Sequence, residues 1–263
     1  MKKSNLILAV VVSIFFLLPS CEKVIDLNLN TSASDIVIQG NVYDYAGPYT
    51  VSISKTVDFT QTNVFPPVTN AVVTISDNAG NSETLIQKTE GKYVTSTLRG
   101  IPGVTYTLKV VIQGKTYTAS STMPKAVNID SIYLQRDLFG NGTEAVIDFT
   151  DPINVDNYYR VDQYVNDTLK SGFYVGDDKL YQGQKISFYL SASSLTGDKP
   201  LIKGDEIKLQ LECIDDKVYE YFRTTKGNNG QSASPANPVS NISNGALGYF
   251  SAASVRQDSI RVP

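Results

Sequence analysis

Residues 105–122 read TYTLKVVI-QG-KTYTASST and carry the clearest structural pattern in the chain. Every second side chain from Tyr106 to Ile112 is apolar, which is the period of a β-strand with one buried face. Gln113-Gly114 supplies a two-residue turn that contains glycine, the length that favours a tight hairpin. Residues 115–122 return as the partner strand. The pattern therefore predicts an antiparallel β-hairpin.

Short strand patterns continue on the N-terminal side of this hairpin, and no helical period interrupts them between residues 35 and 123. Turn residues rich in Gly, Pro, Asn and Asp separate the strands at short intervals. This arrangement is typical of a β-sandwich, here of the immunoglobulin-like or transthyretin-like kind. We expect this domain to end at Met123-Pro124. Its predicted strands are 36–42, 49–55, 71–76, 93–98, 105–112 and 115–122.

The remaining residues, 124–263, predict a second β-rich domain with one short helix. The helix is expected over 216–225, because Val218, Tyr221 and Phe222 follow the i, i+3, i+4 spacing and Gly227 follows as a stop. The fold class is therefore mainly β. The predicted strands of this half are 130–136, 144–150, 158–165, 168–175, 185–190, 206–214, 246–252 and 259–262.

The N-terminus has the features of a lipoprotein signal peptide, residues 1–20. Lys2 and Lys3 precede the apolar segment 6–18, which is shorter than the roughly 20 residues that span a bilayer. Leu18-Pro19-Ser20-Cys21 resembles a lipobox, with Pro19 as a departure from the usual pattern. We expect the Cys21 thiol to carry the lipid and residues 21–34 to connect it to the first domain. The alternative is an ordinary secretory signal, which would leave Cys21 an incidental thiol.

Composition narrows the function classes. Without the signal residues the chain keeps 243 of 263 residues and, having lost Lys2 and Lys3 from its 23 basic side chains, carries 21 basic against 26 acidic ones, a net charge of −5. This balance argues against nucleic-acid binding and against electrostatic attraction to anionic lipid. The chain has no histidine, which removes Ser-His-Asp and Cys-His nucleophiles and most zinc sites. Cys213 follows a strand alternation, and we interpret it as a small core residue.

No motif in the chain indicates catalysis. Ser52 and Lys55 match a Ser-x-x-Lys pattern, but on a strand positions three apart point to opposite faces. Asp77–Asn81 and Asp177-Asp178 lack the ligand spacing of a calcium loop and are interpreted as turns. The acids of 144–151 could supply a carboxylate pair for glycoside hydrolysis, although a solvated strand face is the simpler interpretation. We therefore expect no enzyme activity, no metal and no cofactor.

Two loops are candidate recognition surfaces. Residues 57–70 contain Phe59 and Phe65 between two strands, and exposed aromatic loops often mark a partner surface. The alternative is that both rings fold back and close the end of the sandwich. The second loop, in 228–250, has packing between the domains as its alternative. Its candidate residues are Asn237, Asn241, Tyr249 and Phe250.

Several short segments together resemble a known family: CEKVIDL (21–27), IQGNV (38–42), GPYTV (47–51), FPPV (65–68), and NPVSNI with GALGYF (237–242 and 245–250). The family is an uncharacterised lipoprotein family of the Bacteroidota, known as domain of unknown function 4249. The resemblance covers essentially the whole mature chain. It implies an outer-membrane lipoprotein encoded beside TonB-dependent receptors, and it supplies no catalytic or binding residues.

The expected function is a non-enzymatic accessory role in uptake. We expect a protein anchored in the outer membrane through Cys21 that captures a ligand or docks on a TonB-dependent receptor. Two alternatives from other classes stay open. One is a structural or adhesive module of the cell envelope, for which a sandwich fold is equally suitable. The other is a hydrolase that uses carboxylates.

Overall fold

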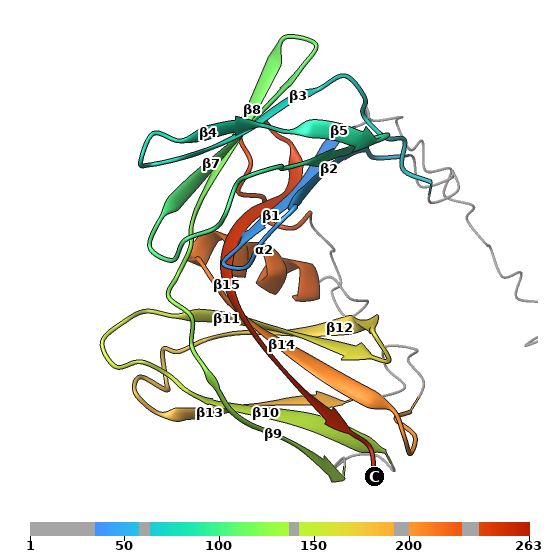
Figure 1. The fold of residues 1–263 in the computed structure, drawn as a ribbon, viewed down its shortest axis with the longest axis vertical. Helices are drawn as coiled ribbons and strands as arrows, with labels where there is room; N and C mark the ends of the chain where they lie inside the picture. Colours follow the sequence, from blue (N-terminus) through green and yellow to red (C-terminus); the bar gives the residue numbers. More distant parts are fainter. Residues whose placement is uncertain (1–34, 58–63, 137–141, 192–199, 228–236) are drawn as a thin grey trace, which may run out of the picture. The chain divides into compact units, whose positions relative to one another are not determined.

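The computed structural model describes residues 35–57, 64–136, 142–191, 200–227 and 237–263 (Figure 1). In these ranges the chain is mainly β with one short helix, so the predicted fold class is confirmed. None of the described helices is long and apolar enough to cross a membrane. The elements are β1 (Ile36–Tyr43), β2 (Thr50–Lys55), β3 (Val72–Asp77), β4 (Ser82–Thr84), β5 (Ile86–Thr89), β6 (Lys92–Val94), β7 (Thr105–Ile112), β8 (Lys115–Thr122), β9 (Ile129–Arg136), β10 (Thr143–Thr150), β11 (Tyr158–Val165), β12 (Thr168–Asp177), β13 (Lys185–Ser191), β14 (Glu206–Ile214), α2 (Asp216–Gly227) and β15 (Leu247–Arg261).

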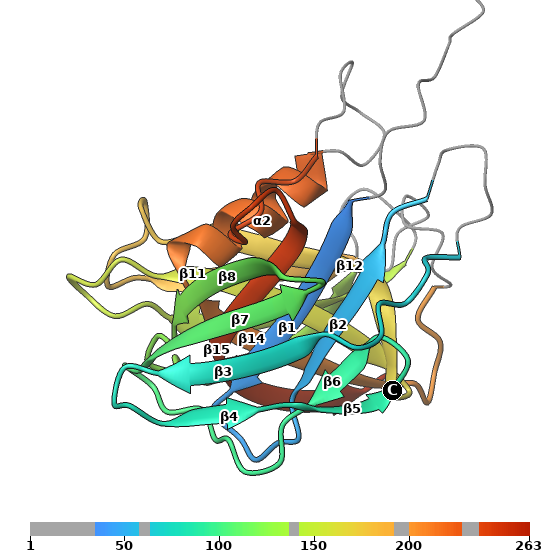
Figure 2. The same cartoon turned by 90° about the horizontal axis from the view of Figure 1, so that it is seen from above.

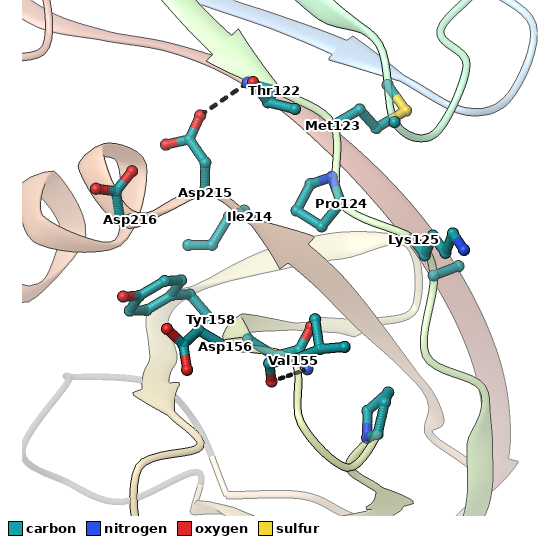
Figure 3. Close-up of a pocket in the computed structure, with 14 residues that line it drawn as sticks. Thr122, Met123, Pro124, Lys125, Val155, Asp156, Tyr158, Ile214, Asp215 and Asp216 are labelled. Atoms are coloured by element: carbon teal, nitrogen blue, oxygen red, sulfur yellow. Dashed lines mark hydrogen bonds between the residues drawn. The ribbon is translucent and has the colours of Figure 1, made fainter. Parts of the chain in front are cut away.

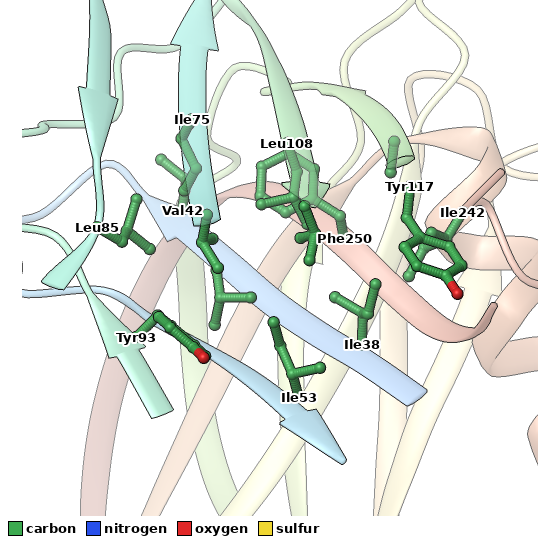
Figure 4. Close-up of a cluster of buried hydrophobic side chains, with 14 of the residues drawn as sticks. Ile38, Val42, Ile53, Ile75, Leu85, Tyr93, Leu108, Tyr117, Ile242 and Phe250 are labelled. Carbon is green, nitrogen blue, oxygen red and sulfur yellow. The ribbon is translucent and has the colours of Figure 1, made fainter. Parts of the chain in front are cut away.

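The first sandwich packs a four-stranded sheet, β4-β3-β7-β8, against the β15-β1-β2-β6-β5 part of a larger sheet (Figure 2). The predicted hairpin is β7 and β8, which pair in register from Thr105 opposite Thr122 to Ile112 opposite Lys115. Alternate apolar side chains from both sheets fill the space between them (Figure 4). The sandwich therefore follows from the period-2 pattern of its strands.

The second sandwich packs the three-stranded sheet β13-β10-β9 against the β12-β11-β14 part of the larger sheet. Its core includes Phe149, Tyr159 and Leu209, all fully buried. Phe149 and Tyr159 come from opposite sheets, and their ring centroids lie 4.6 Å apart. Cys213 is buried in the same core, where the sequence placed it.

The long C-terminal strand β15 belongs to both sandwiches. Residues 247–253 pair in parallel with β1, and residues 254–261 pair antiparallel with β14. One eight-stranded sheet thus runs through both halves, and Ser34–Pro263 forms one compact unit. The sequence predicted two separate strands, 246–252 and 259–262, and this is wrong. Of the residues between them, Ala253 pairs with β1 and residues 254–258 pair with β14, and polar Gln257 and Asp258 only interrupt the apolar pattern.

Two further strand predictions need correction in the first sandwich. The predicted strand 93–98 is shorter, because β6 ends at Val94. The Glu83 carboxylate accepts hydrogen bonds from the backbone of Thr97 at 3.2 Å and Leu98 at 2.7 Å, which replaces strand pairing there. Strands β4 and β5 were missed, since they are three and four residues long and mostly exposed, and so show no buried face in the sequence.

Candidate functional site

A pocket of about 690 Å³ lies where the β8–β9 connection passes β11 and the start of α2 (Figure 3). Its volume is within the range of small-molecule sites in proteins. Three segments form most of its lining, to which Gly103 and Pro152 add: 122–126 from the connection between the sandwiches, 155–158 before and at the start of β11, and 214–216 at the end of β14. The pocket thus depends on both sandwiches.

The lining combines an apolar floor with an acidic mouth. Pro124 and Ile214 contribute apolar surface, and Ile214 is buried. Three carboxylates line the pocket, and Lys125 is the one basic side chain among the residues described as its lining. Asp156 and Asp216 are exposed and belong to different segments of the lining (Figure 3). This arrangement favours a ligand with an apolar body and a positive group over an anionic one.

The third carboxylate, Asp215, has a structural task. One of its oxygens accepts the Val218 backbone N–H at 2.9 Å, which caps the N-terminus of α2. The other accepts the Ser121 hydroxyl and, at 3.2 Å, the Thr122 backbone N–H, both from the end of β8. Burial raises the pKa of Asp215, and these hydrogen bonds oppose the rise. Asp215 therefore fixes the helix start against the first sandwich and leaves Asp156 and Asp216 to face a ligand.

Beside the pocket, two loops of the second sandwich are joined by buried polar groups. Asp151 accepts a hydrogen bond from the Tyr159 hydroxyl at 2.5 Å and from the Gly183 backbone at 3.2 Å. Asp178 accepts the Asn157 backbone N–H at 2.8 Å and the Gln182 side-chain amide at 2.9 Å. These contacts tie loop 151–157 to loop 178–184.

The same two loops expose apolar side chains. Ile153 is 69% exposed and Leu180 is 81% exposed, and Val155 and Tyr181 are about half exposed. We call loops 151–157 and 178–184 the apolar loop pair. Its tips are apolar although its base is polar and buried, the reverse of an ordinary surface loop. Val155 also lines the pocket, so the loop pair and the pocket are continuous.

The structure separates the residues that the sequence singled out. Cys21 and Phe59 lie outside the described residues. Phe65 is 52% exposed, whereas Val68 is buried in the first core. Asn237 is exposed. Of the predicted recognition residues that the structure describes, none lines the pocket.

Three of the predicted recognition residues of 228–250 make contacts within the fold. Phe250 is fully buried in the first core, so it is not available to a ligand. Asn241 holds the β15 backbone, because its side-chain amide donates to the Phe250 carbonyl at 2.8 Å and accepts the Phe250 N–H at 2.9 Å. Tyr249 packs against α2, with its ring centroid 4.8 Å from that of Phe222. The correction concerns their role as recognition residues, because the strand predicted over 246–252 is present as the start of β15.

The acidic groups weighed as ligand sites have partners within the fold. Asp77 accepts the Asn81 side-chain amide at 2.7 Å and its backbone N–H at 2.8 Å, which makes it a turn residue. Asp148 pairs with Lys185 at 2.6 Å, and Glu144 accepts a hydrogen bond from Gln135. Across the described ranges, no group of three or more acidic or cysteine side chains is placed to hold a metal ion.

Sequence reasoning missed the pocket itself. Met123-Pro124 was interpreted only as a boundary, and Asp216 only as a helix start. The sequence did contain a sign of the pocket, because its segments all lie at the ends of predicted strands, where binding residues are often found. These segments are the connection between the sandwiches, the end of the strand at Ile214 and the turn at 152–156.

The profile of a family described as a domain of unknown function (DUF4249) matches residues 22–259. None of the curated proteins matches the chain. Among solved structures, a two fibronectin type-III domain segment from chicken tenascin shares 11% identity, with 88% of this chain and 100% of that chain covered and a TM-score of 0.25. A putative carbohydrate binding protein from Bacteroides uniformis shares 8% identity, with 86% and 98% covered and a TM-score of 0.27. The FN1–FN3 domains of chicken CNTN1 share 10% identity, with 70% and 62% covered and a TM-score of 0.23.

Proposed function

The chain belongs to the family DUF4249, and from that premise we propose that it is a lipid-anchored outer-membrane binding module that holds a partner or ligand at the pocket and the apolar loop pair. The observation that supports the proposal is that the two loops of the candidate surface are already held in place by contacts within the fold. The buried Asp151 and Asp178 contacts fix the two loops, so binding would cost little ordering of the backbone.

The chemistry of the site favours binding over catalysis. The chain contains no histidine, and Asp215 is committed to the helix cap and to β8. Asp156 and Asp216 are exposed to solvent, which suits them to pairing with a ligand more than to activating water in a sheltered site. A positive group on a ligand would pair with these two carboxylates, and its apolar part would lie on Pro124 and Ile214.

The address rests on the lipobox. Acylation of Cys21 would hold the protein at the outer membrane, and residues 22–34, even fully extended, reach about 45 Å. The first sandwich would then stay close to the bilayer, where a partner embedded in the same membrane is at high effective concentration. A TonB-dependent receptor is the partner that the family resemblance implies, and capture or gating of its nutrient is the role we assign.

Affinity purification from detergent-solubilised native membranes tests this function. We expect the natively expressed protein to recover a TonB-dependent receptor, and we expect a Cys21→Ser variant, exported without acylation, to recover much less of it. Recovery of the acylated protein with no receptor would contradict the docking role. Recovery with a surface polymer instead would support the adhesive alternative.

A further inference from the structure

One end of the first sandwich combines exposed apolar side chains with lysines. A hollow of about 480 Å³ lies there, lined by the start of β1 at Ile36, by Lys55 at the end of β2 and by Lys115 after the β7–β8 turn. Residues 67–70 line the same hollow. The segment just before them exposes Val64, at 72%, and Phe65, at 52%.

The backbone around Phe65 is held by strand β2. The Lys55 N–H donates to the Pro66 carbonyl at 2.9 Å, and the Val68 N–H donates to the Ile53 carbonyl at 2.9 Å. Val68 itself is buried in the core, and the Tyr93 hydroxyl donates to its carbonyl at 3.1 Å. Phe65 is therefore presented outward from a fixed backbone.

The charges at this end suit a phosphate-bearing surface. Among the residues that the structure describes, none forms an ion pair with Lys55 or Lys115, and none that lines the hollow is acidic. The Lys115 ammonium lies 5.1 Å above the ring of Tyr117. Asp35 precedes Ile36, which lines the hollow, and Glu90 precedes Gly91, whose carbonyl accepts the Ile53 N–H of β2. This end therefore carries acidic residues as well as lysines. Lysines in such a setting contact lipid phosphates at short range, without long-range attraction.

The place where the N-terminal segment joins the first sandwich indicates which surface this end contacts. The described chain begins at this end, since Ile36 opens β1 and lines the hollow beside both lysines. At most about 50 Å of chain separates Cys21 from this point. We propose that this end of the first sandwich lies on the phospholipid bilayer that holds the Cys21 lipid. Val64 and Phe65 enter the boundary between headgroups and acyl chains, and Lys55 and Lys115 contact phosphates.

This inference rests on the acylation of Cys21 proposed above, and it adds an orientation to it. A single lipid chain anchors weakly, and apolar side chains that enter the interface add a second contact. The net charge of −5 does not oppose this contact, because the lipid on Cys21, and not electrostatic attraction, brings this end of the protein to the membrane.

The absence of tryptophan from the chain allows a direct test. The full acylated protein carrying Phe65→Trp is reconstituted into vesicles of phosphatidylethanolamine and phosphatidylglycerol in which part of the lipid has brominated acyl chains. We expect a blue-shifted emission that the bromines quench by about twofold or more. Ile202→Trp, at an exposed position of the second sandwich, is the matched control and should remain unquenched.

Two further measurements keep the outcomes distinct. Lys55→Ser with Lys115→Ser, added to Phe65→Trp, should lower the quenching while thermal unfolding stays unchanged. Intact mass spectrometry of the same sample reports acylation. If the acylated Phe65→Trp protein showed no quenching of its tryptophan emission, the membrane-facing end would be overturned and the anchor left intact. An unacylated N-terminus would overturn the anchor and this inference together.

Discussion

Gly248 lies so close to Ile38 that a β-carbon built on it would overlap the Ile38 carbonyl oxygen. The two residues are partners in the parallel pairing of β15 with β1, and the φ of Gly248 is +96°. This contact joins the end of the chain to its first described strand. The pairing of β15 with β1 and with β14 makes one sheet of the two sandwiches.

Gly248→Ala should therefore lower the free energy of unfolding by about 3 kcal/mol or more, because a methyl group meets backbone atoms that cannot move aside and the φ is unfavourable for alanine. Urea denaturation measures the loss. Gly80→Ala is the matched control, since Gly80 has a φ of +93° and no atom within 4 Å of the point that a β-carbon would occupy. It should cost only about 1–2 kcal/mol. Equal losses in the two variants would contradict the steric explanation.

Beneath α2, the larger sheet buries a group of charges. The Arg160 guanidinium contacts both Asp162 oxygens at 2.9 Å and lies 4.1 Å from the centroid of the Phe222 ring. Glu212 faces Arg160 across the β11–β14 pairing and is almost completely buried. Its carboxylate accepts the Gln210 amide at 2.6 Å. A single guanidinium thus lies beside two carboxylates, so it balances the negative charge of Glu212 only in part.

Stability should fall as the pH rises from about 4.5 to about 7. Burial raises the pKa of Glu212 to about 7, although Arg160 opposes the shift. In this window the unfolded chain has released the Glu212 proton and the native state still holds it, so the free energy of unfolding decreases with pH, by about 3 kcal/mol in total. Glu212→Gln removes this contribution. Urea denaturation at pH 5 and pH 8 should show that the variant gains stability relative to the parent protein as the pH rises. Parallel pH profiles would show that Glu212 does not titrate in this range.

The hairpin of 105–122 was predictable because its strands and turn are neighbours in the sequence, so the pattern of each strand and the turn between them specify one pairing. The continuity of strand β15 was not, and the strand was predicted as two pieces, because its partners, β1 and β14, lie far away in the chain. From Phe250 to Val255 its side chains are buried on both faces, and this hides the alternation that marks a strand.

The pocket escaped prediction for the same reason. Pro124, Asp156 and Asp216 meet only after both sandwiches form, and nothing local ties them together. Phe65 was predictable as a surface candidate, because an aromatic residue beside two prolines in a long connection has no strand pattern to bury it. Phe250 was assigned both to the predicted strand 246–252 and to a recognition loop, and the structure supports only the strand, with Phe250 buried in it.

Asp215 couples the helix to the first sandwich, so its removal should cost more than an ordinary cap. Asp215→Ala leaves the Val218 and Thr122 N–H groups without their acceptor, and we expect a loss of about 2–3 kcal/mol in urea denaturation. Asp215→Asn keeps an oxygen for the cap and should lose about 1 kcal/mol. If both variants lost less than about 0.5 kcal/mol, the capping role would be refuted.

Partner binding should require the exposed side chains of the apolar loop pair, whereas the stability of the fold should not. Leu180→Ser with Tyr181→Ser removes two exposed side chains of the loop pair, so the free energy of unfolding should change by no more than about 0.5 kcal/mol. Recovery of the receptor from membranes should fall about tenfold or more, as for the central residues of an interface. Ile86→Ser, at an exposed position of β5, is the control. Unchanged recovery with the double variant would place docking elsewhere.

The thiol of Cys213 should react only after unfolding. It is buried, its sulfur accepts the Val127 N–H at 3.3 Å, and burial raises its pKa to about 12. At pH 8 a thiol reagent should therefore react with the native protein on the order of a thousandfold more slowly than with a free cysteine.

The same thiol titration in denaturant also shows whether the Cys21 thiol is free, because the chain contains two cysteines and the number of reactive thiols can be counted. Unfolded acylated protein should give one reactive thiol, since the sulfur of Cys21 would be bonded to lipid, and Cys213→Ser should reduce that number to none. Two thiols in the unfolded parent protein would show that Cys21 is free. Rapid reaction in the native state would instead show that the second core opens at Cys213, against its burial between the sheets.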